Sequence, residues 1–467
     1  MPESHGSVNQ TDHTGKRTGC LIYTAGGVVV LALFLWLGVA GWYDEAKSRF
    51  ESEAATIAQH GEPLWFADLE PRPVPLDDDA APLVLQALAK LVRPAPGFYD
   101  LLAADPPTPP GLYDVLEATL AANRPALEIL TQALGKPHCH FSYDYATHDT
   151  FGILLQHVQD CRDLSRLLEA DVLHSLAVGD RDRAAAAVAE NLGLGGLLYE
   201  DPFIISQLVR MAIAARAIYS LHTILAHATL STEQFTELDE RLDQMGANFT
   251  LRPAVVADRA CILTAMQHLD ENVNMVDGLD AAQAAKYDPQ RWHRRPALWR
   301  EQAFMLHALT EFADLVDKTG PASIQAVAEL EGRYERDSAE LPLNRLIGSV
   351  SFRFKPHITG VRHRQRLNIA RLGIRVARYR AQHGELPDSL DGVVDESLRP
   401  MLVDLFSGQP LVYRATAAGF IIYPVDEDGI DNGGGVKPDE TEGKCRFEVQ
   451  YPESAERLPK DQACFGQ

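Results

Sequence analysis

The sequence predicts a mostly α-helical protein with an N-terminal transmembrane helix, a body of helical hairpins and a small C-terminal antiparallel β module. Three observations lead to this fold class. A long uncharged apolar run follows Arg17, segments rich in Ala and Leu fill the middle of the chain, and short β-branched and aromatic runs follow Gly384. The length of 467 residues is enough for about three folded units.

The composition is that of a folded, acidic protein. Hydrophobic residues make up 46% of the chain and charged residues 23%, which are values typical of globular proteins. Forty-three Lys and Arg residues stand against 65 Asp and Glu, giving a formal net charge of -22. Because binding to phosphates needs a positive field, we expect no nucleic-acid partner.

Residues 20–43 are predicted to form the transmembrane helix. The 26 residues between Arg17 and Asp44 carry no charge, and the run from Leu21 to Tyr43 is almost wholly apolar. At a rise of ~1.5 Å per residue this run is long enough to cross a hydrocarbon core of ~30 Å. We therefore expect the chain to contact the lipid bilayer through this segment.

Basic residues next to the apolar run indicate the orientation. Lys16 and Arg17 precede it, so residues 1–19 are predicted to be a short cytoplasmic tail, with the bulk of the chain extracytoplasmic. The expected location is the cell membrane, in single-pass topology. A cleaved signal peptide is the alternative, although the run is longer than the usual apolar region of ~7–15 residues.

Residues 44–383 are predicted to form an all-helical extracytoplasmic body. Apolar residues at steps of three and four predict a helix that opens at Asp149 or Thr150 and ends near Gly179. Asp180 is a suitable N-cap for the next helix, so the two helices should form an antiparallel hairpin with a very short turn.

The segment from Phe203 to Ala228 is predicted to be a central helix, because it is apolar on nearly every face. A second membrane span is the alternative, but polar and charged residues such as Arg210 and Arg216 interrupt the segment at intervals that lipid disfavours. Further helices are expected at about 232–246, 253–270, 297–318, 321–336 and 357–383.

Residues 384–436 are predicted to form the small β module. Gly and Pro residues separate two short runs, Leu411–Tyr413 and Gly419–Tyr423, which suit a hairpin or a small meander. Residues 437–467 are rich in acidic side chains and are predicted to be a loosely ordered tail.

Several stretches of the C-terminal part resemble the C-terminal module of type II secretion major pseudopilins. They are Tyr379–Leu390, Asp404–Tyr413, Gly419–Tyr423 and the pair Asp428–Gly429. The same stretches are similar to the ending of many uncharacterised bacterial single-span membrane proteins, and for that group the likeness extends upstream through 164–210. The resemblance implies a shared β module, and the chain departs from the pseudopilin pattern at Leu405.

The pseudopilin resemblance also implies a calcium loop. Pseudopilin modules bind calcium near their closing Asp-Gly turn, which places Asp426, Asp428 and Asp431 as the candidate ligands here. Read from the residues alone, this turn combines carboxylates with glycines, the flexible oxygen-rich chemistry that a hard cation prefers. The spacing does not fit an EF-hand, and an exposed acidic turn without a metal is the alternative.

Two further candidates come from cysteine and histidine. Cys445 and Cys464 fall together in the polar tail, where a disulfide bond is one possibility and two thiols the other. The segment His138–His157 holds the densest group of metal-binding side chains, and a His-x-His pair at His138 and His140 can present two imidazoles to one zinc ion. The alternative is a connecting segment whose polar side chains cap helices and hydrogen-bond to the backbone.

A basic block precedes the β module. Arg364, Arg371, Arg375 and Arg378 share one helical face and form a candidate surface for anionic lipid, a polymer or an acidic partner. We favour the alternative, in which this face pairs with acidic helices of the same chain.

The function expected from these observations is a membrane-anchored extracytoplasmic scaffold or interaction protein whose partner is a protein or an envelope polymer. Sequence signatures of common enzyme classes, such as G-x-S-x-G, H-E-x-x-H and the phosphate-binding loop, do not occur. Two alternatives stay open: a metal-dependent hydrolytic enzyme built on His138–His157, and an accessory component of a secretion or envelope assembly.

Overall fold

The structure is a computed structural model that describes residues 14–95, 97–102, 111–268, 295–339, 341, 354–416, 418–425, 431 and 445–451. Of residues 14–29, 100 and 101 it describes the backbone alone. Twelve α-helices make up most of this part of the chain, and one three-stranded antiparallel sheet accompanies them. The predicted mostly α fold with a small antiparallel β module is confirmed at this level.

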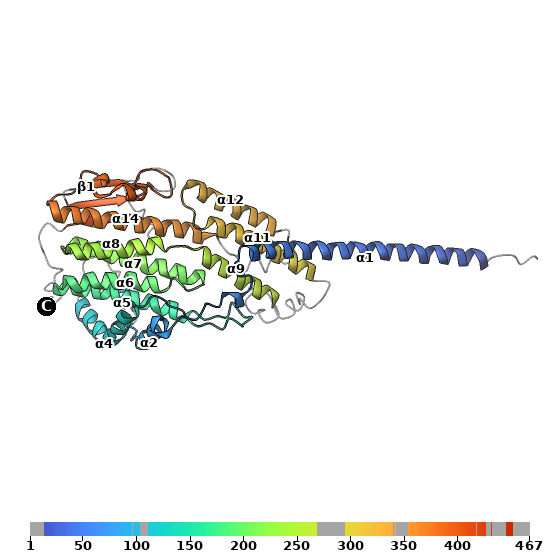
Figure 1. Ribbon diagram of the computed structural model, residues 1–467, viewed down its shortest axis with the longest axis horizontal. Coiled ribbons are helices and arrows are strands. Elements are labelled where there is room, and N and C mark those ends of the chain that lie inside the picture. Colours follow the sequence, from blue (N-terminus) through green and yellow to red (C-terminus); the bar gives the residue numbers. More distant parts are fainter. Residues whose placement is uncertain are drawn as a thin grey trace, which may run out of the picture.

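Helix α1 (Thr14–Gln59) is one continuous helix of 46 residues that projects out of the body (Figure 1). The boundaries predicted after residues 19 and 43 are not breaks in the backbone. Ion pairs one turn apart, Arg49 with Glu45 and Lys47 with Glu51, favour the helix beyond the apolar run. The helix stops where Gly61 adopts a positive φ of 69°.

The predicted hairpin is formed by α5 (Gln156–Val178) and α6 (Arg181–Leu197). Gly179 ends α5 with a left-handed φ of 79°, a conformation that suits glycine. The Asp180 carboxylate then accepts a hydrogen bond from the Arg183 amide at 3.0 Å and caps α6. The Gly-Asp turn is therefore confirmed.

The predicted start of α5 was wrong, because residues 149–155 are not helical. Asp149 instead accepts a hydrogen bond from the Gly152 amide at 2.9 Å, and the Thr150 hydroxyl donates to the Cys261 carbonyl at 2.9 Å. These bonds fix a turn against a distant helix. Leu154, which fits the helical periodicity, is 86% exposed and packs no core.

The other predicted helices are present, with ends that shift by a few residues. They are α7 (Ile204–His227), α8 (Thr232–Ala247), α9 (Arg252–Gln267), α11 (Arg295–Leu315), α12 (Pro321–Ser338) and α14 (Lys355–His383). Helices α5, α6, α7, α8 and α14 lie side by side along the long axis of the body (Figure 1). Their facing side chains form the largest apolar core, which continues into the sheet.

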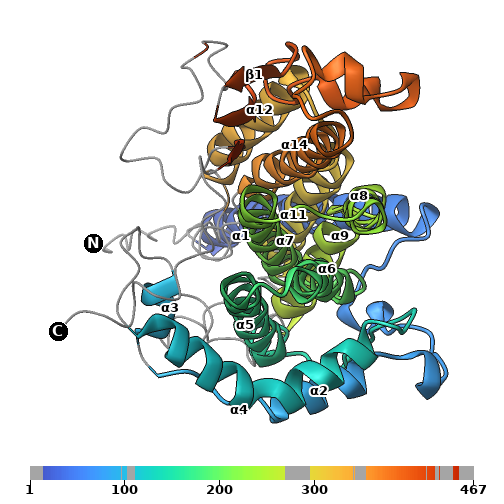
Figure 2. The ribbon, with the colours of Figure 1, turned by 90° about the vertical axis from the view of Figure 1, so that its left-hand side faces the viewer.

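An outer layer covers the hairpin on the side away from the sheet. It contains α2 (Ala81–Ala89), α3 (Phe98–Leu102) and α4 (Leu112–Ala133), and Figure 2 shows α4 running across this edge. The short 3₁₀ helices η1 (Phe66–Leu69) and η2 (Leu76–Asp78) connect α1 to this layer. A second apolar core joins α2 and α4 to α5.

The sheet has the strand order β1 (Val412–Thr416), β2 (Gly419–Tyr423) and β3 (Phe447–Gln450). The predicted hairpin pairs Val412 with Tyr423, and β2 pairs Phe420 with Val449. Strand β3 lies in the segment that the sequence assigned to an acidic tail, so the boundary at residue 436 does not end the module. The sequence analysis missed this strand because its partner strand, β2, lies more than 20 residues earlier in the chain.

Two short 3₁₀ helices, η5 (Leu390–Val393) and η6 (Glu396–Leu402), connect α14 to the sheet along the chain. The sheet packs on α14. Phe447 of β3 lies on Gly373, where an added Cβ would meet the ring at 2.2 Å. Glycine at this position therefore allows close approach of the strand to the helix.

Among the residues whose side chains the structure describes, α7 is the one helix long and apolar enough to cross a membrane. More than half of its most apolar stretch, 56%, is buried within the body. Helix α7 contacts α6, α5, α14 and β3, so protein covers most of its surface.

Candidate functional site

The described part of the apolar run on α1 is exposed. Eight large apolar side chains are between 43% and 68% exposed, namely Val30, Leu31, Leu33, Phe34, Leu35, Trp36, Leu37 and Val39. They occur on all sides of the helix, which projects beyond the described part of the body in Figure 1. An apolar surface of this kind is unfavourable in water.

The second half of α1 is attached to the body. Tyr43 meets Trp299 of α11 edge to face at a centroid distance of 5.0 Å, and Ile57 is fully buried with Leu263 and Leu306. Just past the helix, Glu62 accepts hydrogen bonds from Arg252 at 2.5 Å and Arg259 at 2.8 Å. The apolar half therefore extends from a rigidly held base.

A second candidate site lies in the connection between α4 and α5. His138 donates its amide to the Asp78 carbonyl at 3.1 Å, and its carbonyl accepts from the Ala80 amide at 2.7 Å, in an isolated parallel bridge. The His140 amide donates to the Asp79 carboxylate at 3.0 Å. In extended backbone, side chains two positions apart point to the same side, so both imidazoles face one way.

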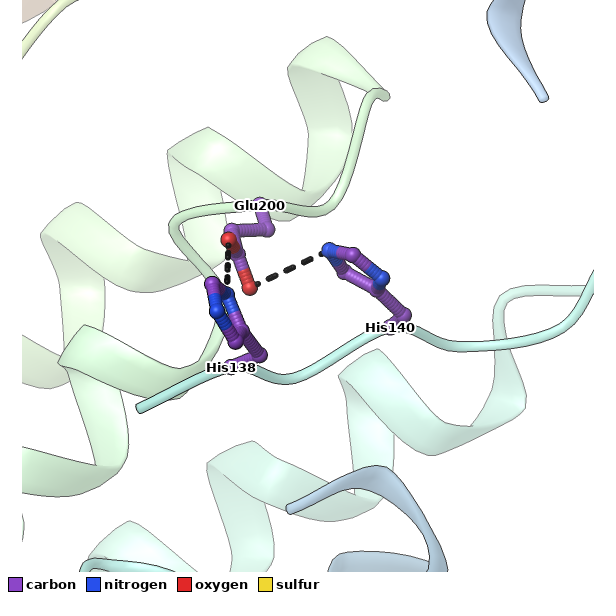
Figure 3. Close-up of side chains that lie close together, drawn as sticks. All are labelled: His138, His140 and Glu200. Carbon is purple, nitrogen blue, oxygen red and sulfur yellow. Dashed lines mark hydrogen bonds and ion pairs between the residues drawn. The ribbon is translucent and has the colours of Figure 1, made fainter. Parts of the chain in front are cut away.

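Glu200, in the turn that follows α6, lies between the two imidazoles (Figure 3). His138 Nδ1 is 3.0 Å from Glu200 Oε1, and His140 Nε2 is 3.4 Å from Glu200 Oε2. The Cys139 amide donates to Oε2 at 2.8 Å, which fixes the carboxylate from the backbone. We name these three side chains, His138, His140 and Glu200, the His-His-Glu cluster.

Within the cluster, the His138 imidazole and the Glu200 carboxylate stabilise each other's charged form. The hydrogen bond to Glu200 raises the pKa of His138 above its ordinary value. Burial alone would raise the pKa of the Glu200 carboxyl, but the hydrogen bonds from His138 and from the Cys139 amide outweigh it, so this pKa is lowered. Glu200 is thus held as a carboxylate facing two imidazoles.

A hydrogen-bonded group lies beside the cluster, around the buried carboxylate of Asp201. The Tyr143 hydroxyl donates to Asp201 Oδ2 at 2.6 Å, and His157 Nε2 lies 3.2 Å from the same oxygen. Burial, followed by the Asp201 charge, raises the pKa of Tyr143. The His148 ring stacks on the ring of His268 at a centroid distance of 3.5 Å.

The sequence analysis included both histidines of the cluster but not Glu200 as their partner. A signal for it was present in the hairpin. His157 and Asp201 lie the same number of residues from the Gly179 turn, on opposite sides of it, and such positions are neighbours in an antiparallel hairpin. That register brings Glu200 to the segment that precedes α5.

The structure pairs most of the predicted arginine face with acidic residues of the same chain. Arg371 lies 2.9 Å from Asp239 and also contacts Asp243, both on α8, and Arg375 lies 2.5 Å from Asp239. Arg364 binds Asp317 at 3.1 Å. Arg378, the fourth residue of this face, lies on α14 with the other three. An anionic partner for this face stays a prediction.

The calcium and disulfide predictions fall largely outside the described residues. Asp426, Asp428 and Cys464 lie outside them, whereas Asp431 accepts hydrogen bonds from Tyr423 at 2.9 Å and Arg414 at 2.7 Å. The Cys445 thiol lies 3.3 Å from the Arg362 carbonyl. Both predictions therefore stay open.

No family model, no curated protein and no solved structure matches this chain.

Proposed function

We propose that this chain is a single-pass membrane protein in which the apolar half of α1 anchors the helical body at the membrane surface. The observation that carries this proposal is the exposed apolar run on α1, from Val30 to Val39. Burial of a large apolar side chain contributes about 1.5–3 kcal/mol, so removal of this run from water into lipid is strongly favourable. In the sequence the run extends from Leu21 to Tyr43, and a helix of this length is about as long as a bilayer core is thick.

Helix α7 is the rival anchor, and its surroundings argue against that role. Arg210 and Gln207 are 1% and 2% exposed, so both point into the body. A helix in lipid would instead turn its apolar side chains outward. We therefore assign α7 to the core of the body and α1 to the membrane.

The body acts, in this proposal, as an extracytoplasmic interaction module. Helix α7 presents an exposed stripe at steps of seven residues, formed by Ile205, Ala212 and Tyr219. Ile205 is 56% exposed and Tyr219 61%. Exposed side chains aligned along one face of a helix form a candidate contact surface, so a partner protein is the expected ligand of this stripe.

Thiol labelling in intact cells tests the orientation. Ser4→Cys places a thiol before the apolar run, and Glu396→Cys places one on the body, where the native side chain is 87% exposed. With Cys20 and Cys464 replaced by Ser in both variants, we expect a membrane-impermeant maleimide to label Glu396→Cys in intact cells and Ser4→Cys only after the membrane is permeabilised. The reverse pattern would contradict the proposed orientation.

Site-specific photo-crosslinking in membranes tests the stripe on α7. A photoreactive residue at position 219 should give a discrete crosslinked product, whereas one at the exposed Glu240 of α8 should not. The absence of a product specific to position 219 would remove the interaction surface from the proposal. Metal-dependent hydrolysis and an accessory role in secretion stay predictions from the sequence.

A further inference from the structure

We propose that the His-His-Glu cluster binds a divalent transition-metal ion, with Zn²⁺ as the expected occupant. The donors are one imidazole nitrogen each of His138 and His140 and one carboxylate oxygen of Glu200, and the nitrogens that face Glu200 are His138 Nδ1 and His140 Nε2. This inference is independent of the membrane anchoring, because it concerns the body alone.

The spacing of the donors suits a small ion. The three donor atoms lie within 4.8 Å of one another. His138 Nδ1 is 3.0 Å from Glu200 Oε1 and His140 Nε2 is 3.4 Å from the other oxygen, Oε2. In tetrahedral zinc sites with bonds of ~2.0–2.1 Å, ligand atoms are about 3.3 Å apart. The donors therefore surround the ion after small movements of the imidazole rings, which lie 5.7 Å apart between centroids.

The chemistry of the donors selects the ion. Two imidazole nitrogens and one carboxylate oxygen form a set typical of zinc and of neighbouring transition metals, whereas Ca²⁺ and Mg²⁺ prefer oxygen ligands. The Glu200 carboxylate adds a negative charge that offsets part of the charge of the ion. A calcium ion is accordingly not expected to compete at this site.

The backbone holds the donors before any ion arrives. The Cys139 amide bonds Glu200 at 2.8 Å, and the Asp79 carboxylate binds the His140 amide at 3.0 Å. Outer contacts of this kind orient metal ligands and contribute to affinity. His140 comes from the connection after α4 and Glu200 from the turn after α6, so a bound ion would join two segments of the fold.

Solvent reaches the cluster. The side chain of His138 is 42% exposed, that of Glu200 27% and that of His140 19%. An ion can therefore enter from water. Three protein ligands leave the fourth tetrahedral position to a water molecule, as in zinc sites that act on substrates.

Zinc titration of the full chain in detergent micelles tests the proposal. After treatment with a chelator, Zn²⁺ is added in the presence of a chromophoric competitor to wild type, His138→Ala, His140→Ala and Glu200→Gln. The control is His60→Ala, which removes an exposed histidine outside the cluster. Loss of a residue that only supports a metal ligand commonly weakens metal binding by about 10–100-fold. Loss of a ligand itself should weaken it more, so each cluster variant should weaken zinc binding by at least about 100-fold.

Each outcome decides the matter. The proposal is supported if wild type and His60→Ala hold one tight zinc ion that the cluster variants lose, and if millimolar calcium does not displace it. It is overturned if Glu200→Gln binds zinc as tightly as wild type. Circular dichroism checks that the variants are folded, and Glu200→Gln keeps the shape of the side chain and an oxygen acceptor for the Cys139 amide.

Discussion

The ion pairs of Glu62 are predicted to hold the base of α1 to the body, and Glu62→Ala should weaken this attachment strongly. Glu62 is 14% exposed in its side chain and binds Arg252 at 2.5 Å and Arg259 at 2.8 Å. Arg259 is 1% exposed, and its other hydrogen bonds go to the Thr310 hydroxyl and the Pro63 carbonyl. Without Glu62, a buried guanidinium loses its carboxylate.

The expected loss is large because the remaining charge is buried. Removal of one partner of a buried ion pair destabilises a protein by about 3–5 kcal/mol, whereas an exposed pair contributes about 0–1 kcal/mol. The matched control is Asp314→Ala, since Asp314 is 61% exposed and also binds Arg252, at 2.5 Å. Urea unfolding of the full chain in micelles measures both variants.

The comparison of the two variants gives the decision. We expect Glu62→Ala to lower the free energy of unfolding by at least about 2 kcal/mol more than Asp314→Ala. Equal losses would refute the reasoning that burial of Arg259 makes this contact strong. The double variant Glu62→Leu with Arg259→Met should recover much of the loss, because it removes both buried charges together.

Two further predictions concern close packing and pH. Gly373→Ala should destabilise the body by about 1–3 kcal/mol, because the new Cβ would meet the Phe447 ring at 2.2 Å. The control is Gly246→Ala, whose Cβ would have its nearest neighbour at 3.8 Å and which should be neutral or stabilising. Thermal unfolding measures both variants. Burial, together with nearby arginines, holds the pKa of His363 well below its ordinary value of 6.5. The unfolded chain therefore takes up a proton below pH 6.5 that the folded chain does not, and wild type should lose stability relative to His363→Gln by about 1.4 kcal/mol per pH unit as the pH falls. Parallel stability curves for these two proteins between pH 7 and 5 would show that His363 does not titrate in this way.

The helical body could be predicted from the sequence because local signals and tertiary packing agree there. Gly179 and Asp180 mark the hairpin turn, and the apolar faces of α7 and α14 repeat at helical spacing. Packing of such faces stabilises helices where they are predicted. The start of α5 was missed because side-chain hydrogen bonds from Asp149 and Thr150 outweigh an apolar periodicity that continues through the turn.

The candidate metal site could be predicted only in part. The His-x-His pair is a local pattern, so His138 and His140 were identified from sequence. Glu200 is about 60 residues away along the chain and reaches them through the register of a hairpin, which a single local pattern does not contain. The same limitation applies to β3, whose partner strand β2 precedes it by more than 20 residues.

Extraction of the membrane fraction with alkaline carbonate tests the anchoring by α1 most directly. The variant Leu33→Asp with Phe34→Asp places two charges near the middle of the apolar run, where each is expected to cost about 2.5–3.5 kcal/mol in lipid. Ser48→Asp, an exposed position on the same helix beyond the run, is the control. We predict that wild type and Ser48→Asp stay in the membrane pellet and that the double variant moves to the supernatant, whereas recovery of wild type in the supernatant would contradict the account.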